Sequence, residues 1–269
     1  MEGAAVSARD LGLRGSSGAV FEGVSLEAPP GALIAVTGPS GSGRTCLLLT
    51  LTGRMRPTSG HATVAGHRVP QRMGSVRRVA ALGPVPGVTD LEPSWTVTEH
   101  LRERALLRRP RRGLRRERAA ERRERVAEAL DRAGLRPGDL PKGPRTTVRH
   151  LERLEALRLG VALALLDRPR LLALDDADLK LSDPERAELW ELLRGLTEEG
   201  TTVLAVCSEP PPDVLTVRTT TTGEGPGEPV EERDDAPGDA PDGEPGDVPG
   251  DDTTGEGDAD DACTTTGRA

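Results

Sequence analysis

Two short segments of the sequence carry residue types that bind phosphate groups and a divalent cation. The first is Gly38-Pro39-Ser40-Gly41-Ser42-Gly43-Arg44-Thr45, which joins an apolar, strand-like run (31–38) to an apolar, helix-like run (46–53). Glycines let consecutive backbone N–H groups curl around phosphate oxygens, and the N-terminus of the following helix adds a partial positive charge. Thr45 is placed to offer its hydroxyl group to Mg²⁺. These eight residues are therefore expected to bind the phosphates of a nucleotide.

Arg44 stands where this motif has lysine. Lysine is a compact point charge that reaches the β- and γ-phosphates, whereas arginine is bulkier and planar. The chain has 34 Arg and only two Lys, a bias that weakens any argument from a single arginine. Arg44 keeps the positive charge, so binding of phosphates is expected to survive better than fast transfer of the γ-phosphate.

The second segment is an apolar, strand-like run that ends in two carboxylates, Asp175 and Asp176. Asp175 is placed to hold Mg²⁺ through water, and Asp176 follows where a catalytic base that polarises water would sit. The side chain of Asp176 is one methylene shorter than that of a glutamate, so its carboxylate lies nearer the backbone. Together the two segments supply both halves of a nucleotide site.

The elements that must position these segments alternate between strand-like and helical patterns. Apolar strand runs joined by amphipathic or apolar helices predict an α/β domain with a mostly parallel sheet. The expected strands are 31–38, 61–66, 78–82, 170–176 and 201–208, and the expected helices are 46–53, 97–136 (broken around Pro110 and Gly113), 151–167 and 184–196.

Composition excludes several classes of protein. The core must rest on Leu, Val and Ala, because the 269 residues include one Phe, two Trp and no Tyr. No run approaches the roughly 20 apolar residues that span a bilayer, and the N-terminus lacks the features of a secretory signal. Cys46, Cys207 and Cys263 stand alone, without the paired spacing of a zinc site or a disulfide framework. We therefore expect a cytoplasmic protein.

Charge divides the chain into two parts. Residues 219–269 hold 16 acidic and two basic side chains, whereas residues 1–218 hold 34 basic and 28 acidic ones. The acidic segment is built from Thr, Gly, Pro, Asp and Glu and buries too little apolar surface to offset its ordering entropy. We predict a folded domain at 1–218 and a disordered acidic tail at 219–269.

The segment 101–136 contains fourteen arginines interleaved with glutamates at helical spacing. Arginine clusters neutralise phosphates, which would favour nucleic acid, but no aromatic residues are interleaved to stack on bases. Glutamates such as Glu121 supply i,i+4 partners for the arginines. A solvated helical face is the favoured interpretation, and contact with a membrane protein or with anionic lipid stays open.

The order of the motifs resembles that of the ATP-binding cassette ATPases, the motor subunits of ABC transporters. The resemblance covers roughly residues 10–210 and rests on GPSGSGRT, LTGRMRPTSGHATVAGHRV, WTVTEHL, RLLALDDADLKLSDPE and TTVLAVCSE, in that order. It implies a P-loop NTPase fold with an N-terminal β subdomain and an inserted helical subdomain at about 97–167. By the same resemblance Gly38–Thr45 is the Walker A loop, Asp175 is the Walker B acid, and Asp176 stands where the family has its catalytic glutamate.

Three family positions are altered in this sequence. The glutamine loop has Gly83 or Pro84 in place of glutamine, the signature segment reads Leu151-Glu152-Arg153-Leu154-Glu155, and Ser208 replaces the switch histidine. In the family the signature of one cassette caps the γ-phosphate bound by the other, so carboxylates at Glu152 and Glu155 would repel it. The loop after Walker B is expected to end at Asp183. A homodimer of this chain is expected to be a very poor ATPase.

The resemblance implies an ATP-binding subunit of an ABC-type transporter that uses ATP and Mg²⁺. Its expected partners are a separate membrane-spanning subunit and a second cassette, in a homodimer or a heterodimer, with peripheral placement at the inner face of the membrane. Hydrolysis is expected to be weak or partner-dependent. The alternative function is a catalytically inactive, nucleotide-binding regulatory or scaffold module.

Overall fold

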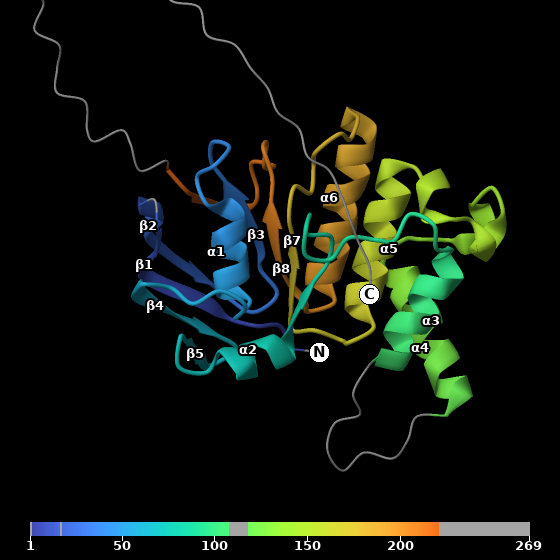
Figure 1. Ribbon diagram of the computed structural model, residues 1–269, viewed down its shortest axis with the longest axis horizontal. Helices are drawn as coiled ribbons and strands as arrows, with labels where there is room; N and C mark the ends of the chain where they lie inside the picture. Colours follow the sequence, from blue (N-terminus) through green and yellow to red (C-terminus); the bar gives the residue numbers. More distant parts are fainter. Residues whose placement is uncertain (1, 17, 108–117, 221–269) are drawn as a thin grey trace, which may run out of the picture. The chain divides into compact units, whose positions relative to one another are not determined.

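The computed structural model describes residues 2–16, 18–107 and 118–220. The predicted tail from residue 221 onward and the predicted break around Pro110 and Gly113 lie outside these residues. The elements, in chain order (Figure 1), are β1 (Val6–Gly15), β2 (Gly18–Ala28), β3 (Leu33–Thr37), α1 (Arg44–Leu51), β4 (Ser59–Val64), β5 (His67–Val69), α2 (Met73–Val79), β6 (Ala80–Leu82), α3 (Val97–Leu107), α4 (Ala119–Arg132), α5 (Arg153–Leu165), β7 (Leu171–Leu174), α6 (Asp183–Glu198), β8 (Thr202–Val206) and β9 (Leu215–Arg218).

A five-stranded parallel sheet in the order β6-β7-β8-β3-β9 forms the centre of the domain. Its strands are nearly continuous apolar runs because both faces are covered. Ile34 and Val36 of β3 pack with α1 and the N-terminal strands, whereas Ala35 faces the core shared with α5 and α6. The predicted α/β class and parallel sheet are confirmed, and the carboxyl ends of β3 and β7 deliver the two candidate site segments.

A second, antiparallel sheet in the order β2-β1-β4-β5 forms the predicted N-terminal β subdomain. Phe21 of β2 and Val64 of β4 are fully buried between this sheet and α1. The sheet therefore holds α1, and with it the phosphate loop, from the side opposite α5 and α6 (Figure 1).

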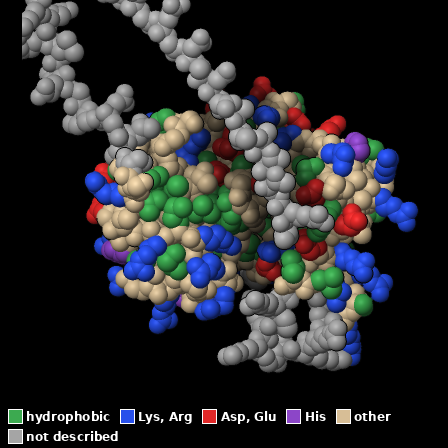
Figure 2. All heavy atoms as spheres, viewed as in Figure 1, with side chains coloured by type: hydrophobic (Ala, Val, Ile, Leu, Met, Phe, Trp, Pro, Cys, Tyr) green, Lys and Arg blue, Asp and Glu red, His purple; other side chains and the backbone are tan. Residues whose placement is uncertain are grey.

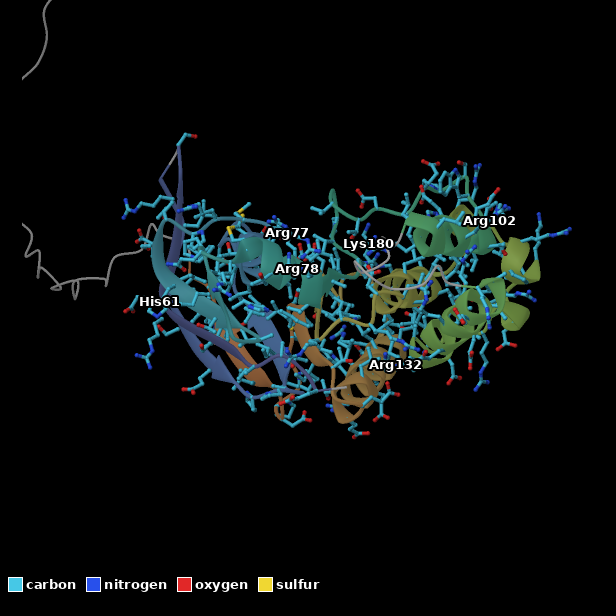
Figure 3. The ribbon with its side chains drawn as sticks, turned by 90° about the horizontal axis from the view of Figure 1, so that it is seen from below. His61, Arg77, Arg78, Arg102, Arg132 and Lys180 are labelled. Atoms are coloured by element: carbon cyan, nitrogen blue, oxygen red, sulfur yellow. The ribbon has the colours of Figure 1, made fainter. Side chains whose placement is uncertain are left out.

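The helical subdomain consists of α3, α4 and α5, which meet through Leu101, Ala129 and Leu157. On this side of the molecule, acidic and basic side chains are interspersed (Figure 2). The labelled basic residues Arg77, Arg102 and Arg132 lie apart on α2, α3 and α4 (Figure 3). The solvated helical face of residues 101–136 stays a prediction, because residues 108–117 of that segment lie outside the described residues. None of the described helices is long and apolar enough to cross a membrane.

The structure differs from the predicted elements in several places, and β1, β2, β5 and α2 were not among the elements predicted by residue range. Residues 78–79 end α2 rather than beginning a strand, because only Ala80–Leu82 pair with β7. Strand β9 was not predicted, since its register against β3 is set by contacts distant in sequence. Thr219, assigned to the tail from composition, is 1% exposed, and its amide donates to the carbonyl of Thr37. The ordered part therefore continues past 218.

Candidate functional site

The phosphate loop adopts a backbone that its three glycines make possible, all of which have positive φ. Gly38 has φ 149° and Gly43, which caps α1, has φ 80°. A Cβ atom on Gly38 would lie 2.4 Å from the carbonyl oxygen of Thr219, and one on Gly43 would lie 2.6 Å from that of Val20. Pro39, Ser40 and Gly41 are exposed at the tip. The backbones of Thr219 and Val20 thus lie close against the two ends of the loop, and the middle of the loop is exposed.

Ser42 supports this loop from within. Its hydroxyl group shares a hydrogen bond of 2.6 Å with that of Thr219, and its amide donates to the carbonyl of Pro39. Thr219 in turn bonds the carbonyl of Thr37 through both its amide and its hydroxyl. Sequence reasoning missed Thr219, because its contact with Ser42 spans 177 residues.

Thr45 and Asp175 join the two halves of the site. The Thr45 hydroxyl donates to Asp175 Oδ2 at 2.6 Å, across a separation of 130 residues. Asp175 is 4% exposed, and its amide donates to the carbonyl of Pro84. Burial raises the pKa of Asp175 and the neighbouring Asp176 adds to the effect, against the opposing hydrogen bonds from Thr45 and the Asp176 amide and the charge of Arg44.

A buried carboxylate beside a hydroxyl group offers the oxygen ligands that Mg²⁺ prefers. Magnesium binds through one or two protein oxygens together with substrate phosphates and water, and the open phosphate loop begins next to Thr45. A cation would also relieve the cost of ionising Asp175. The residues present therefore fit Mg²⁺, with Thr45 and Asp175 as the groups that would hold it.

Arg44 and Asp176 face one another across the site. A terminal guanidinium nitrogen of Arg44 lies 4.0 Å from Asp176 Oδ1. Asp176 has φ 45°, a conformation that is costly for a residue with a side chain and that recurs at functional sites. Its carbonyl accepts a hydrogen bond from Arg153 at the start of α5. Arg44 and Asp176, the two residues that differ from the family pattern at this site, therefore lie next to each other.

The glutamine-loop position is a closed turn after β6. The Gly83 amide donates to Ala173 of β7, and the hydroxyl of Thr89 donates to the Gly83 carbonyl at 2.6 Å. Pro84 is the residue that faces Asp175, through its carbonyl. A Cβ atom on Gly160 of α5 would lie 2.6 Å from Pro84 Cγ, so the helix packs directly on this proline.

The altered signature segment begins α5. Glu152 is the N-cap, and its side chain accepts from the backbone of Glu155 while the Glu152 amide donates to Glu155 Oε2 at 2.8 Å. This reciprocal capping box satisfies amides that a helix N-terminus otherwise leaves free for an anion. The two carboxylates therefore occupy this helix end themselves.

The switch position is tied down by a carboxylate that sequence reasoning missed. Asp178 is 7% exposed and accepts from the amides of Ser208, at 2.8 Å, and Glu209, at 3.0 Å. The sequence did contain a signal for Asp178, because it is the third acidic residue directly after the buried strand β7. The loop after Walker B gives way to α6 at Asp183, with Ser182 as the N-cap, so its predicted end agrees with the structure to within one residue.

Comparison with known families matches residues 21–178 to the ABC transporter family. Among curated relatives, the Nod factor export ATP-binding protein I of Burkholderia thailandensis is 30% identical over 189 residues, which are 69% of this chain and 56% of that protein. An ABC transporter ATP-binding/permease protein of Mycobacterium tuberculosis is 33% identical over 70% of this chain and 20% of its own length. The chain spans about half the length of the first of these relatives.

Solved structures resemble the fold. The ATP-binding cassette MJ0796, in a dimeric post-hydrolysis state bound to ADP and Pi, superposes with a TM-score of 0.61 at 23% identity, covering 76% of this chain and 88% of that one. CbiO1 of Clostridium perfringens, part of an ABC transporter complex, gives 0.63 at 20% identity over 77% and 80%. At these identities the likeness concerns the fold, while the family match covers more than half of the sequence. The chain belongs to the ABC transporter family, as a P-loop cassette of its ATP-binding type.

Proposed function

We propose that this chain is the ATP-binding subunit of an ABC-type transporter and that it binds ATP–Mg²⁺ through Gly38–Thr45 and Asp175. The observation that carries the proposal is the 2.6 Å hydrogen bond from Thr45 to Asp175. It brings a glycine-rich loop and a buried carboxylate together in the arrangement that Mg²⁺ and a triphosphate need. Arg44 supplies positive charge to the phosphates, and Asp176 stands next to it as the candidate base.

Hydrolysis by this chain alone is weak. The turn at Pro84 and the serine at 208 replace groups that would stabilise charge on the γ-phosphate, and each is held by internal hydrogen bonds. Loss of one such preorganised group typically costs on the order of 100-fold in rate. An assembled partner would have to supply what is missing.

The second cassette in the assembly is a different chain. A helix N-terminus that receives a γ-phosphate needs free amides and no negative charge. Here Glu152 and Glu155 fill that position on α5. A heterodimer with a cassette whose signature is intact would leave this chain's own phosphate loop usable, whereas a homodimer would not.

A membrane-spanning subunit docks in the groove between the turn after β6 and helices α3 and α5. The groove has a volume of about 430 Å³ and is lined in part by Val88, Leu107, Leu163 and Arg54. Val88 and Leu107 are among the large apolar side chains that are exposed, at 51% and 64%. Burial, Arg77 and Arg104 lower the pKa of Arg54 to about 10, so an acidic group from the partner would be favoured there. Docking would hold the chain at the inner face of the membrane.

The groove is tested by Leu107→Glu, with Leu106→Glu as the matched control. Leu106 is also exposed, at 56%, but does not line the groove. Leu107→Glu should release the chain from sedimented membranes of its own cells, and Leu106→Glu should not. Equal membrane association of both variants would contradict docking at this groove.

The nucleotide site is tested by calorimetric titration of the full chain with ATP–Mg²⁺, beside Arg44→Ala and Asp175→Asn, with phosphate release followed in the same samples. We expect binding that weakens in both variants and little release. Absence of binding at millimolar ATP would refute the transporter-motor function.

The alternative is a nucleotide-binding regulatory or scaffold module without turnover. The buried Asp178, which fixes the backbone of Ser208 and Glu209, favours it, because a fixed loop does not respond to a γ-phosphate. Phosphate release that stays at background after a partner cassette is added would support this alternative. Release that appears with the partner would support the motor.

A further inference from the structure

We propose that six arginines around the end of α1 and along α2 bind the anionic lipid headgroups of a membrane surface. This basic face consists of Arg54, Arg56, Arg68, Arg72, Arg77 and Arg78, of which all but Arg54 are exposed. The inference rests on the proposed function, because it extends the placement of the chain at a membrane from the docking groove to the lipid beside that groove.

The excess positive charge of the folded part is concentrated in one stretch of sequence. Residues 28–89 contain seven Arg and no Asp or Glu, and six of the seven form the basic face. The rest of residues 1–218 holds 27 basic and 28 acidic side chains, so its charge is nearly balanced. A general preference for arginine explains the seven arginines but not the absence of acidic residues. This segregation of charge therefore points to a negatively charged partner.

Contacts between adjoining elements bring these arginines onto one side of the domain. Arg77 of α2 donates to the carbonyl of Gly53 after α1 at 2.7 Å, which places it near Arg54. At the other end of α2, the amide of Arg72 donates to the carbonyl of Arg68 of β5, also at 2.7 Å. Figure 2 shows Lys and Arg side chains gathered at the lower left of the domain, where Figure 1 places α2 and β5.

No carboxylate within the described residues forms an ion pair with an arginine of the basic face. Elsewhere acidic neighbours are present, as where Arg194 pairs with Asp213 at 3.0 Å. Burial, followed by the charges of Arg77 and Arg104, lowers the pKa of Arg54 to about 10. An anion held at this face would favour the charged form of Arg54 and offset the repulsion between the arginines.

Two observations favour a lipid surface over nucleic acid as the anion. Arg54 also lines the groove proposed for the membrane-spanning subunit, so the basic face continues from that groove. Met55 and Met73 are half-buried beside the arginines, and a surface that combines basic and apolar side chains suits the headgroup region of a bilayer. Residues 28–89 contain no aromatic side chain that could stack on a base.

The experiment is flotation of the full chain with vesicles of phosphatidylcholine alone and with vesicles that contain phosphatidylcholine and phosphatidylglycerol in equal parts. We expect binding to the mixed vesicles only, weakening as salt is added. The net charge of −8 should not prevent this, because at physiological ionic strength charges are screened over about 8 Å. Equal binding to both vesicles, or binding to neither, would overturn the inference. Duplex DNA that binds more tightly than the mixed vesicles, at equal phosphate concentration, would overturn the choice of lipid.

Arg72→Gln combined with Arg78→Gln locates the binding surface. Neither side chain forms a hydrogen bond to the backbone of the described residues, and each charge near an anionic surface strengthens binding about fivefold. This variant should therefore bind the mixed vesicles roughly 25-fold more weakly, and the corresponding double lysine variant should keep the affinity. Arg136→Gln with Arg145→Gln removes the same charge from exposed positions between α4 and α5 and should change little. Equal weakening in both glutamine variants would overturn the assignment to the basic face.

Titration of the same proteins with ATP–Mg²⁺ separates this inference from the proposed function. The Arg72 and Arg78 variant should bind ATP–Mg²⁺ like the original chain, because neither residue belongs to the nucleotide site. Binding of ATP–Mg²⁺ without binding of vesicles would refute the basic face and leave the nucleotide site standing. Binding of vesicles without binding of ATP–Mg²⁺ would refute the proposed function and leave the basic face standing.

Discussion

Replacing Asp175 by asparagine should separate stability from ligand binding at this site. Asparagine keeps the size of the side chain and can still accept the hydrogen bond from Thr45, which now measures 2.6 Å. It removes one negative charge from a position that is 4% exposed. We expect Asp175→Asn to be more stable than the original chain without ligand and to bind ATP–Mg²⁺ more weakly.

The weaker binding follows from the lost interaction with the cation. A contact with a charged group contributes roughly 1.5–3 kcal/mol, which corresponds to a rise of about 10- to 150-fold in the dissociation constant. The effect should depend on Mg²⁺, because the phosphate loop and Arg44 are unchanged. In excess chelator the variant should therefore no longer bind ATP more weakly than the original chain, because no cation is left for Asp175 to hold.

The gain in stability follows from the direction of the pKa shift. Burial, with the charge of Asp176, raises the pKa of Asp175 above its ordinary value. A raised pKa means that folding favours the protonated form, so the contribution to stability is fully present below the ordinary pKa near 3.9 and is lost as the pH rises through the folded-state value. Asparagine imitates the protonated form, so the advantage of the variant should grow as the pH rises through that window and then level off.

The measurements are thermal melting between pH 4 and pH 8 and calorimetric titration with and without Mg²⁺. Asp183→Asn serves as the control, because the Asp183 side chain is 94% exposed on the surface of α6. Our reasoning would be refuted by an Asp175→Asn protein that binds ATP–Mg²⁺ like the original chain, or by one that is less stable at pH 8.

Three further substitutions test how the neighbouring segments are held. Gly43→Ala should cost on the order of 1–3 kcal/mol and abolish ATP binding, because φ is 80° and the new Cβ would meet the Val20 carbonyl at 2.6 Å; melting and titration would reveal both effects. Asp178→Ala should cost about 1–3 kcal/mol by leaving the Ser208 amide without its acceptor, and hydrogen exchange of that amide should accelerate; unchanged exchange would contradict the assignment. Glu152→Ala should cost about 1 kcal/mol in urea unfolding through loss of the N-cap, and no change would show that the capping box contributes nothing.

Local sequence was sufficient to predict the two parts of the site that directly follow a buried strand. The run before Gly38 must be a buried strand, and the glycines that follow allow a backbone that few other residues adopt. The run before Asp175 is likewise buried on both faces of the sheet. Because parallel strands end at one edge, the two segments were expected to meet, and the Thr45–Asp175 hydrogen bond is their meeting point.

The parts that could not be predicted depend on partners far away in sequence. Thr219 lies in a segment whose composition resembles the tail, and its hydrogen bonds to Ser42 on the phosphate loop and to Thr37 of β3 hold it in place. Asp178 looks like one more acid in an acidic loop until the Ser208 amide is placed beside it. Helix α2 has seven residues and no side-chain cap, so its periodicity is too short to identify. In each case tertiary contacts decide what local pattern leaves open.

The altered positions share a physical feature that bears on how such a chain works. Pro84 accepts from the Asp175 amide, Ser208 is held by Asp178, and Glu152 and Glu155 cap their own helix. A group at any of these positions could bond to a nucleotide only by breaking hydrogen bonds inside its own chain and moving. The phosphate loop needs no such movement, because its glycines already leave Pro39, Ser40 and Gly41 exposed. We therefore expect this cassette to bind ATP more readily than it hydrolyses it, and we propose that groups from another subunit supply what the site lacks.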